Sequence, residues 1–515
     1  MIERKMMIGC IVSTDFLKQV SNIWDPTLLE TREAKRITAW CWEYFNKYDK
    51  APGKEIESIF NAKMKTGKIP KDIAEMLEEE ILPGLSKEFK EEEFNLEYVL
   101  EESQKFFKEH KLLKMAGDIV ALVESGESIE AERLAIEYKP TFNGTKEDLD
   151  LSDPIALERV NKAFTTSNEC LIHYPYHLGE FWNNQLVRGG FVALMGPEKR
   201  GKTFWLLDMA LRASKDGKRV AFFQAGDMTE GQQLVRLCIY LTKKSNLERY
   251  AGPIWEATKD CVRNQMNTCT KRMRSCNIGV FEHKTFNEVR HSLTQEDLIK
   301  AHQDNPEYVS CAHHKCGEYK TQKIGAPWVK LVDVGPALES FEAQVSVAKF
   351  FLQTNRKFKL STHANGTLSV RQMKAQLAIW ESQDDFIPDV IIVDYADLLT
   401  GDTKEFRHLQ NEIWKGLRAL SQEKGQPLVI TATQADAKSY DQDRLTTSNF
   451  SEDKRKYAHV TAMFGLNQDT KFREKKIGLM RINELVIREG EFITSNEITV
   501  VQNLKRGRPF IGSYW

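Results

Sequence analysis

Residues 1–138 space their apolar side chains three or four positions apart, as helices with one buried face do. One face of a helix is marked by Ala34, Ile37 and Cys41, and this helix ends before the Ala-Pro-Gly at 51–53. The same spacing predicts helices over Ile73–Leu82, Leu96–Leu113, Met115–Glu124 and Ile129–Tyr138. We therefore predict an all-α N-terminal domain, residues 1–138, that serves assembly or partner contact.

Residues 139–172 are polar at first and lose this periodicity, which indicates a linker. Within them, Ser152 or Asp153 could cap a short helix over Ile155–Phe164. A short helix between two domains is expected to dock on a neighbouring surface.

From residue 173 to residue 515 the pattern alternates between continuous apolar runs and amphipathic stretches. The runs predict strands over 191–196, 219–224, 357–361, 389–394 and 427–434, and a strand-rich end over 478–514. The stretches between them predict helices over 230–242, 339–353, 369–382 and 405–424. Strands that are apolar throughout are buried on both faces, so we predict an α/β domain with a parallel sheet covered by helices.

The composition is that of a globular protein, with 41% hydrophobic and 29% charged residues among 515. A formal net charge of −1 gives no overall basic field, so contact with nucleic acid requires a local patch. No apolar run approaches the roughly 20 residues of a membrane helix, and the start lacks a signal-peptide core. We expect a cytoplasmic protein with no membrane partner, whose nine cysteines are reduced.

The apolar run Phe191–Gly196 leads into a loop that reads Gly-x4-Gly-Lys-Thr, from Gly196 through Gly201 and Lys202 to Thr203. This spacing is typical of a loop whose backbone N–H groups surround phosphates. In such a loop the lysine reaches the β- and γ-phosphates and the threonine hydroxyl ligates Mg²⁺. Apolar residues follow at helical spacing, so the context is strand, loop and helix. The stretch predicts binding of a nucleotide through its phosphates, with Mg²⁺.

Three polar side chains lie at or just beyond the ends of other predicted strands. Asp394 follows four apolar residues and could hold Mg²⁺, and Asp227 could orient or deprotonate an attacking water. Gln434 could sense the γ-phosphate by hydrogen bonding. A helix N-cap is the alternative role for Asp227.

The order of Gly-x4-Gly-Lys-Thr, Phe222–Thr229, Val390–Tyr395 and Ala432-Thr-Gln resembles the RecA-like motor of DnaB-type replicative helicases. The stretch Glu3–Val12 and the Arg36–Asp49 helix also resemble that family's N-terminal domain. The resemblance implies a hexameric ring that hydrolyses ATP between subunits and translocates on single-stranded DNA. It implies Walker A roles for Lys202 and Thr203, a Walker B role for Asp394 and a sensor role for Gln434. A primase or a helicase loader is an implied partner.

The sequence departs from the family at three places. Asp227 stands where the family has a catalytic glutamate, with an extra residue before it. Arg200 occupies a loop position that is usually small. The family's basic pair that reaches the neighbouring subunit's γ-phosphate matches Lys505 and Arg506, with Arg508 as a third candidate. A basic surface turn is the alternative interpretation there.

Residues 258–338 are foreign to the minimal motor and hold five of the nine cysteines. These are Cys261, Cys269, Cys276, Cys311 and Cys316. Pairs of thiolates suit tetrahedral Zn²⁺, so we predict a zinc-binding insert that uses four of the five, with His313 or His314 able to replace one sulfur. Reduced cysteines that only pack in a core are the alternative. The insert's basic residues could touch nucleic acid or a partner.

Candidate DNA contacts follow the strands that end at Asp394 and Gln434. They are Lys404, Arg407, Lys438, Arg444, Lys454, Arg455 and Lys456. The leading hypothesis is a replicative-type DNA helicase that is also an ATP hydrolase. One alternative is a RecA-like ATPase switch or loader that acts on a DNA-bound complex without strand separation. Another is a zinc-ribbon binding module on a motor that binds ATP without hydrolysing it.

Overall fold

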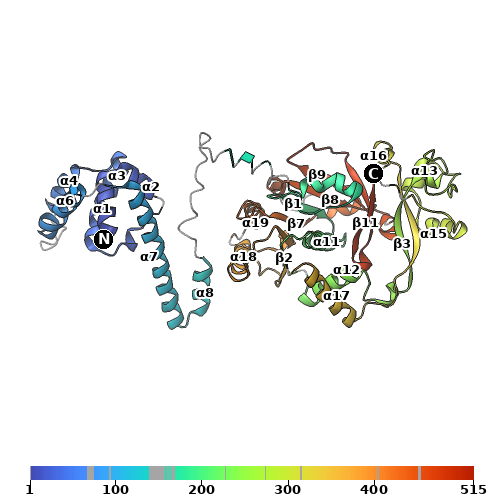
Figure 1. The fold of residues 1–515 in the computed structure, drawn as a ribbon, viewed down its shortest axis with the longest axis horizontal. Coiled ribbons are helices and arrows are strands. Elements are labelled where there is room, and N and C mark those ends of the chain that lie inside the picture. Colours follow the sequence, from blue (N-terminus) through green and yellow to red (C-terminus); the bar gives the residue numbers. More distant parts are fainter. Residues whose placement is uncertain are drawn as a thin grey trace. The chain divides into compact units, whose positions relative to one another are not determined.

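The computed structural model describes all residues except 1, 22, 66–74, 92–93, 138–156, 159, 162–163, 165–168, 227, 273, 312, 314–315, 356, 402, 404, 450–453 and 472. The chain divides into two compact units, Met1–Asp153 and Pro154–Trp515 (Figure 1). The predicted linker, 139–172, and its short helix fall largely outside the described residues. Among the residues described, no helix combines the length and apolar character that a membrane crossing requires.

The first unit is helical where it is described. Its elements are α1 (Ile2–Val12), α2 (Thr14–Val20), η1 (Pro26–Leu28), α3 (Arg32–Tyr48), α4 (Glu55–Lys65), the π-helical η2 (Leu77–Ile81), α6 (Leu82–Glu91), α7 (Leu96–Glu124) and α8 (Ser128–Glu137). Thr31 caps α3 and Asn95 caps α7, each accepting a backbone N–H of the first turn. Met6, Phe16, Ile37 and Phe107 are fully buried where α1, α2, α3 and α7 meet.

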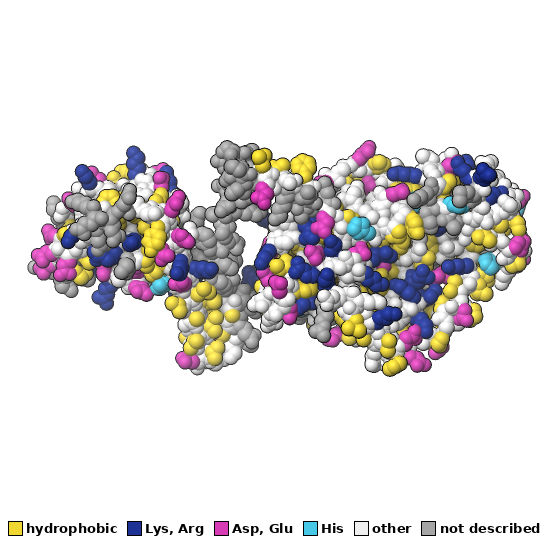
Figure 2. Space-filling view, viewed as in Figure 1, with side chains coloured by type: hydrophobic (Ala, Val, Ile, Leu, Met, Phe, Trp, Pro, Cys, Tyr) yellow, Lys and Arg dark blue, Asp and Glu magenta, His cyan; other side chains and the backbone are white. Residues whose placement is uncertain are grey.

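Two helices of this unit differ from the prediction. The two helices predicted over 96–124 form one continuous helix, α7, because no residue between Leu113 and Met115 breaks the backbone pattern. The predicted Ile73–Leu82 helix is not a regular α-helix in its described part, where a π-helical turn leads into α6. The second half of α7 exposes the apolar side chains of Leu113, Val120 and Val123, and Figure 2 shows apolar surface at the α7–α8 end of this unit.

The second unit is built on a nine-stranded sheet in the order β11-β10-β9-β8-β1-β7-β6-β2-β5. The strands are β1 (Phe191–Gly196), β2 (Val220–Gln224), β5 (Phe358–Thr362), β6 (Val390–Asp394), β7 (Leu428–Gln434), β8 (Ala462–Asn467), β9 (Leu479–Ile487), β10 (Glu497–Asn503) and β11 (Arg508–Tyr514). The six strands from β8 to β5 pair in parallel, and β9, β10 and β11 add antiparallel pairs. The predicted α/β class is confirmed, with an antiparallel extension at one edge.

Helices and turns connect these strands. They are α10 (Tyr176–Trp182), η3 (Asn183–Gln185), α11 (Lys202–Lys215), α12 (Glu230–Thr242), η4 (Glu248–Tyr250), α17 (Ser340–Gln353), α18 (Val370–Asp384), η5 (Ala396–Leu398), α19 (Phe406–Leu420), η6 (Ala437–Asp441), η7 (Thr447–Asn449), η8 (Lys454–Ala458), α20 (Arg473–Ile477) and η9 (Leu504–Arg506). The described helices therefore follow the alternation that the sequence predicts.

Period-two alternation along β1 divides the core between the two faces of the sheet. Phe191, Ala193 and Met195 face the cluster that contains α18 and α19. Val192 and Leu194 face the cluster that contains α10 and α11. Because successive strand side chains point to opposite faces, an entirely apolar strand is what two helical layers require.

The cysteine-rich insert folds on a separate antiparallel pair, β3 (Pro253–Cys261) and β4 (Gly325–Asp333). Between these strands lie α13 (Val262–Gln265), α14 (Phe286–His291), α15 (Gln295–Asp304) and α16 (Glu318–Gln322). Trp328 of β4 packs edge-on against Tyr308, with ring centroids 4.7 Å apart. The core of the insert is continuous with the α10–α11 side of the large sheet.

The two-layer core predicts unequal costs for two leucine truncations. Leu417→Ala, at a fully buried site on α19, should lower the free energy of unfolding by about 2–5 kcal/mol. Leu352→Ala, at a site 84% exposed on α17, should change it by about 0.5 kcal/mol or less. Urea denaturation of both variants measures the difference, and equal costs would contradict the packing described.

Candidate active site

The loop between β1 and α11 lies at the carboxyl edge of the parallel sheet. Gly201 precedes α11 with φ of 85°, a left-handed conformation that favours glycine. A Cβ at Gly201 would come within 2.5 Å of Leu504 Cδ1, so a larger residue there would also have to displace the Leu504 side chain. The N-terminus of α11 opens directly onto the loop, and the N–H groups and dipole at the N-terminus of a helix favour an anion.

Lys202 is the first residue of α11 and is buried beneath the loop. Its Nζ donates to the carbonyl oxygen of Gly196 at 2.7 Å and to that of Pro197 at 2.9 Å. An ammonium group held against loop carbonyls can exchange these contacts for those of a more strongly charged acceptor. The geometry suits recognition of a phosphate at this edge.

Thr203 and Asp394 meet beside Lys202. Asp394 ends β6 and is buried, and its Oδ1 accepts the Thr203 hydroxyl at 3.2 Å. A hydroxyl and a carboxylate are the hard oxygen ligands that Mg²⁺ prefers. The two side chains that the sequence assigns to Mg²⁺ are therefore brought together.

Gln434 ends β7 directly opposite Gly196 in the parallel register of β1 and β7. Its Nε2 donates to the Tyr395 hydroxyl at 2.7 Å, and Tyr395 follows Asp394 in the chain. Gln434 is thus linked to the segment that carries the acid. A loop residue, an acid and an amide side chain converge at one edge, as the sequence predicts.

Asp227 lies outside the described residues, so its role stays a prediction. The N-cap of α12 is Thr229, whose side chain accepts the Gln232 N–H in a capping box. The helix-capping role considered for Asp227 is therefore filled by another residue. Nearby, His363 follows β5 and forms a 2.8 Å hydrogen bond through Nε2 with the Ser361 hydroxyl, and burial lowers the pKa of His363.

The three candidates for the contact with a neighbouring subunit's γ-phosphate lie at and just after η9, and they differ in their burial and partners. Arg506 is buried and donates from Nη1 to Glu256 Oε1 at 2.7 Å and from Nε to the Lys243 carbonyl at 2.9 Å. Arg508 Nη1 donates to the other oxygen of Glu256 at 2.8 Å, and the Glu256 side chain is 1% exposed. Burial lowers the pKa of Arg506 even so.

Lys505 differs from its neighbour because it is exposed and lies over the Tyr250 ring, 4.6 Å from the centroid. In this conformation Arg506 does not extend from the surface as the predicted finger would. That part of the prediction is corrected, and Lys505 is the exposed member of the pair. Adjacent residues on a tight turn point in different directions, which explains why Lys505 is exposed and Arg506 is buried.

A cavity of about 360 Å³ adjoins the loop, and its lining is strongly basic. Its cationic lining residues are Lys199, Arg200, Lys475, Lys476, Lys505 and Arg506. Arg200, the unusual loop residue, turns inward and donates from Nη1 to Gln468 Oε1 at 2.9 Å. Figure 2 also shows Lys and Arg side chains gathered across the middle of this unit, over the region of α11 and α12.

The candidate DNA contacts are not equivalent. Arg407 on α19 and Lys438 on η6 are exposed, whereas Arg444 donates to the Thr494 carbonyl and pairs with Glu497 at 3.7 Å. Lys454 and Arg455 lie in η8, and Lys404 is outside the described residues.

Lys456, also a candidate DNA contact, is corrected. Its side chain is 1% exposed, and its Nζ pairs with Asp397 Oδ1 at 2.7 Å. Asp397, which the sequence did not single out, also accepts the Gln434 backbone N–H at 2.9 Å. The only signal in the sequence was a second acid shortly after Asp394.

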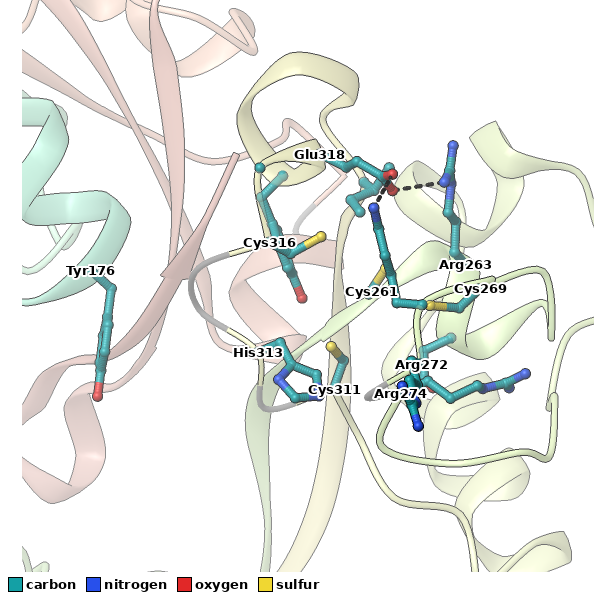
Figure 3. Close-up of a pocket in the computed structure, with 15 residues that line it drawn as sticks. Tyr176, Cys261, Arg263, Cys269, Arg272, Arg274, Cys311, His313, Cys316 and Glu318 are labelled. Atoms are coloured by element: carbon teal, nitrogen blue, oxygen red, sulfur yellow. Dashed lines mark hydrogen bonds and ion pairs between the residues drawn. The ribbon is translucent and has the colours of Figure 1, made fainter.

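Four of the five clustered cysteines line one cavity of about 620 Å³ in the insert. They are Cys261, Cys269, Cys311 and Cys316, and His313 also faces this cavity (Figure 3). Cys276 is not among the lining residues, and His314 lies outside the described residues. Within the part of the chain that is described, no three His, Cys, Asp or Glu side chains lie close enough together to hold a metal ion. Burial raises the pKa of the Cys261 thiol to about 12.

Two carboxylates, Asp260 and Glu318, hold the segments that carry these cysteines. The buried Asp260 carboxylate accepts the Cys311 N–H at 2.7 Å and the Tyr308 hydroxyl at 2.7 Å, and burial raises its pKa. On the other side, Glu318 pairs with Arg263 at 2.7 Å and with Lys271 at 2.9 Å (Figure 3). The cavity walls are thus joined across segments distant in sequence.

The buried Glu256 predicts opposite behaviour for the two residues of the basic turn. Arg506→Ala would remove one of the two guanidinium groups that pair with the Glu256 carboxylate, so the free energy of unfolding should fall by about 1–3 kcal/mol. Lys505→Ala removes an exposed contact with Tyr250 and should cost about 1 kcal/mol or less. Chemical denaturation of both variants tests this, and a larger loss for Lys505→Ala would contradict the contacts described.

Comparison with solved structures identifies proteins of similar fold. No protein-family model and no curated protein matches the chain. A solved DnaB-like replicative helicase, described with its interactions with primase, is 12% identical with a TM-score of 0.57, over 98% of this chain and 98% of that chain. A second solved structure, described as an ATPase domain, is 12% identical with a TM-score of 0.42, over 70% of this chain and 98% of that chain. The chain therefore shares its overall α/β fold with a solved structure of a DnaB-like replicative helicase.

Proposed function

We propose that this protein is an ATP-dependent DNA helicase of replicative type, an ATP hydrolase that works as a homohexameric ring on single-stranded DNA. The observation that carries the proposal is the meeting of Lys202, Thr203 and Asp394 at the carboxyl edge of the parallel sheet. Ligands of open α/β sheets bind at this edge. The donor set of a hydroxyl and a carboxylate fits Mg²⁺, and the adjacent ammonium fits the phosphates of ATP.

Each residue has a separate task in hydrolysis. Lys202 would exchange its loop carbonyls for phosphate oxygens and offset the charge that develops on them. Thr203 and Asp394 would hold Mg²⁺, which supplies charge neutralisation at the phosphates. Gln434 would hydrogen-bond the γ-phosphate, and Tyr395 would take up its amide when that phosphate has left.

Two further tasks in ATP hydrolysis need residues outside the set described above. We assign alignment and deprotonation of the attacking water to Asp227 from its place after β2. We assign contact with a neighbouring subunit's γ-phosphate to Lys505, because it is exposed at η9 while Arg506 is held by Glu256. Hydrolysis at subunit interfaces follows from this second assignment.

Assembly and partners follow from surfaces of the chain. The exposed apolar face of α7, with Leu113, Val120 and Val123, supports self-assembly through the helical unit. The residues proposed to contact the DNA backbone are Lys404, Arg407, Lys438, Lys454 and Arg455. The similar helicase was described with primase, and we extend a primase or loader partner and a cytoplasmic site of action to this chain.

Lys202→Ala should abolish ATP hydrolysis and strand separation while leaving the fold intact. Removing the phosphate-facing cation should lower the ATPase rate about a hundredfold or more. Lys215→Ala, at the exposed far end of α11, is the matched control and should retain the wild-type rate. The measurement is ATPase rate and unwinding of a forked duplex, with thermal unfolding as the check on folding.

Two outcomes would change this proposal. Unwinding that survives in Lys202→Ala would refute it. Wild-type ATPase activity that DNA stimulates, with no separation of the fork, would instead favour a switch or loader.

We also propose that a structural Zn²⁺ is held by Cys261, Cys269, Cys311 and Cys316. The support is that these four line one cavity, while Cys276 does not. Four thiolates are a donor set for tetrahedral zinc, and bound zinc would lower the high pKa of the Cys261 thiol. Metal binding would draw the sulfurs together, and His313 remains able to replace one of them.

Metal analysis of the purified protein tests the zinc proposal. The wild-type chain should carry one zinc, and Cys311→Ser with Cys316→Ser should lose it, because two thiolates cannot close a tetrahedral site. Cys276→Ser is the matched control in the same insert and should keep its zinc. Absence of stoichiometric zinc from the wild-type protein, or equal loss in the control, would contradict this ligand set.

A further inference from the structure

The Lys456 ammonium is a buried cation that the proposed chemistry does not use. It pairs with Asp397 at 2.7 Å, lies 3.4 Å from Thr433 Oγ1 and is 5.7 Å from the centre of the buried Trp414 ring. A buried charge is costly unless it is paired and hydrogen-bonded. This ion pair joins elements that are distant in the chain.

Asp397 is the centre of this contact. Its Oδ2 accepts the Gln434 N–H at 2.9 Å and the Thr433 hydroxyl at 2.8 Å, while Oδ1 accepts from Lys456. The carboxylate thus joins η5, after β6, to the last two residues of β7. Together with the Tyr395 hydroxyl on its side-chain amide, it holds Gln434 from two sides.

Lys456 brings a third element to Asp397. It belongs to η8, in the connection between β7 and β8 that also carries Lys438 and Arg444. Lys454 and Arg455, proposed to contact DNA, immediately precede it in the same turn. A displacement of η8 would therefore act on Asp397 through the buried ion pair, and through Asp397 on the backbone of Gln434.

We propose that the buried Lys456–Asp397 pair positions Gln434 according to the state of the η8 turn, and so couples DNA contact to ATP hydrolysis. Lys456 and Asp397 are positioning residues in this account, since neither touches a reacting atom. The inference rests on the proposed function, because it assigns a regulatory contact to the same site. A pair that only stabilises the fold would affect unfolding and leave the DNA response unchanged.

The test compares the ATPase rate with and without single-stranded DNA. Lys456→Met alone leaves a buried carboxylate unpaired, so the main variant is Asp397→Asn with Lys456→Met, which neutralises both partners. The ratio of DNA-stimulated to DNA-free rate should fall about fivefold or more, with DNA affinity unchanged. Thr433→Val removes the hydroxyl that donates to Asp397 and accepts from Lys456, and it keeps both charges. It should lower the ratio in the same direction, and it keeps the test open if the main variant does not fold.

Asp389→Asn is the matched control on the other end of β6. Asp389 pairs with Arg188 at 3.1 Å and accepts the Arg219 N–H at 2.8 Å, so its loss also breaks an ion pair. This variant should keep the wild-type stimulation ratio. An unchanged ratio in both test variants, or an equal fall in the control, overturns the inference alone. A wild-type protein without ATPase activity overturns the proposed function and this inference with it.

Discussion

Parallel pairing of β1, β7, β6 and β2 is the constraint on which the site depends. The register sets Gly196 opposite Gln434 and Gln224 opposite Asp394, so four strands end along one edge. The helix that starts at Lys202 opens onto the same edge. A slip of one residue would turn every side chain of a strand to the other face. Phe191, Ala193 and Met195 pack in one apolar cluster and Val192 and Leu194 in the other, so side-chain packing on both faces favours this register and also orders the site.

Contacts of buried charged side chains also fix the positions of the segments around this edge. Lys202 is held by loop carbonyls, Lys456 by Asp397, and Glu256 by two arginines. The Lys456 and Glu256 contacts join elements that are distant in the chain, and removing one partner from either would be destabilising. In the insert, Asp260 has the same role for the segment that carries Cys311. The polar interior therefore determines which loops stand together, while the apolar core determines where the strands lie.

The α/β class and the main site residues were predictable because their signals are local. A buried parallel strand is a continuous apolar run, and a polar residue that ends it must lie at the edge. The direction in which a side chain on a tight turn points has no such local signal. The sequence therefore did not show that Lys505 is exposed and Arg506 buried. Lys456 sits in a basic run that is typical of a surface, and its partner Asp397 is 59 residues away. The antiparallel pairing of β3 with β4 in the insert likewise depends on packing between distant segments rather than on local pattern.

The most direct test of this account is electron microscopy of the protein with a non-hydrolysable ATP analogue and single-stranded DNA. The account predicts a ring in which the nucleotide phosphates lie on the Gly196–Thr203 loop, with Lys505 of the adjacent subunit facing the γ-phosphate. DNA should pass through the ring beside the η8 turn. Single chains with no ring, or nucleotide bound away from the Gly196–Thr203 loop, would contradict it.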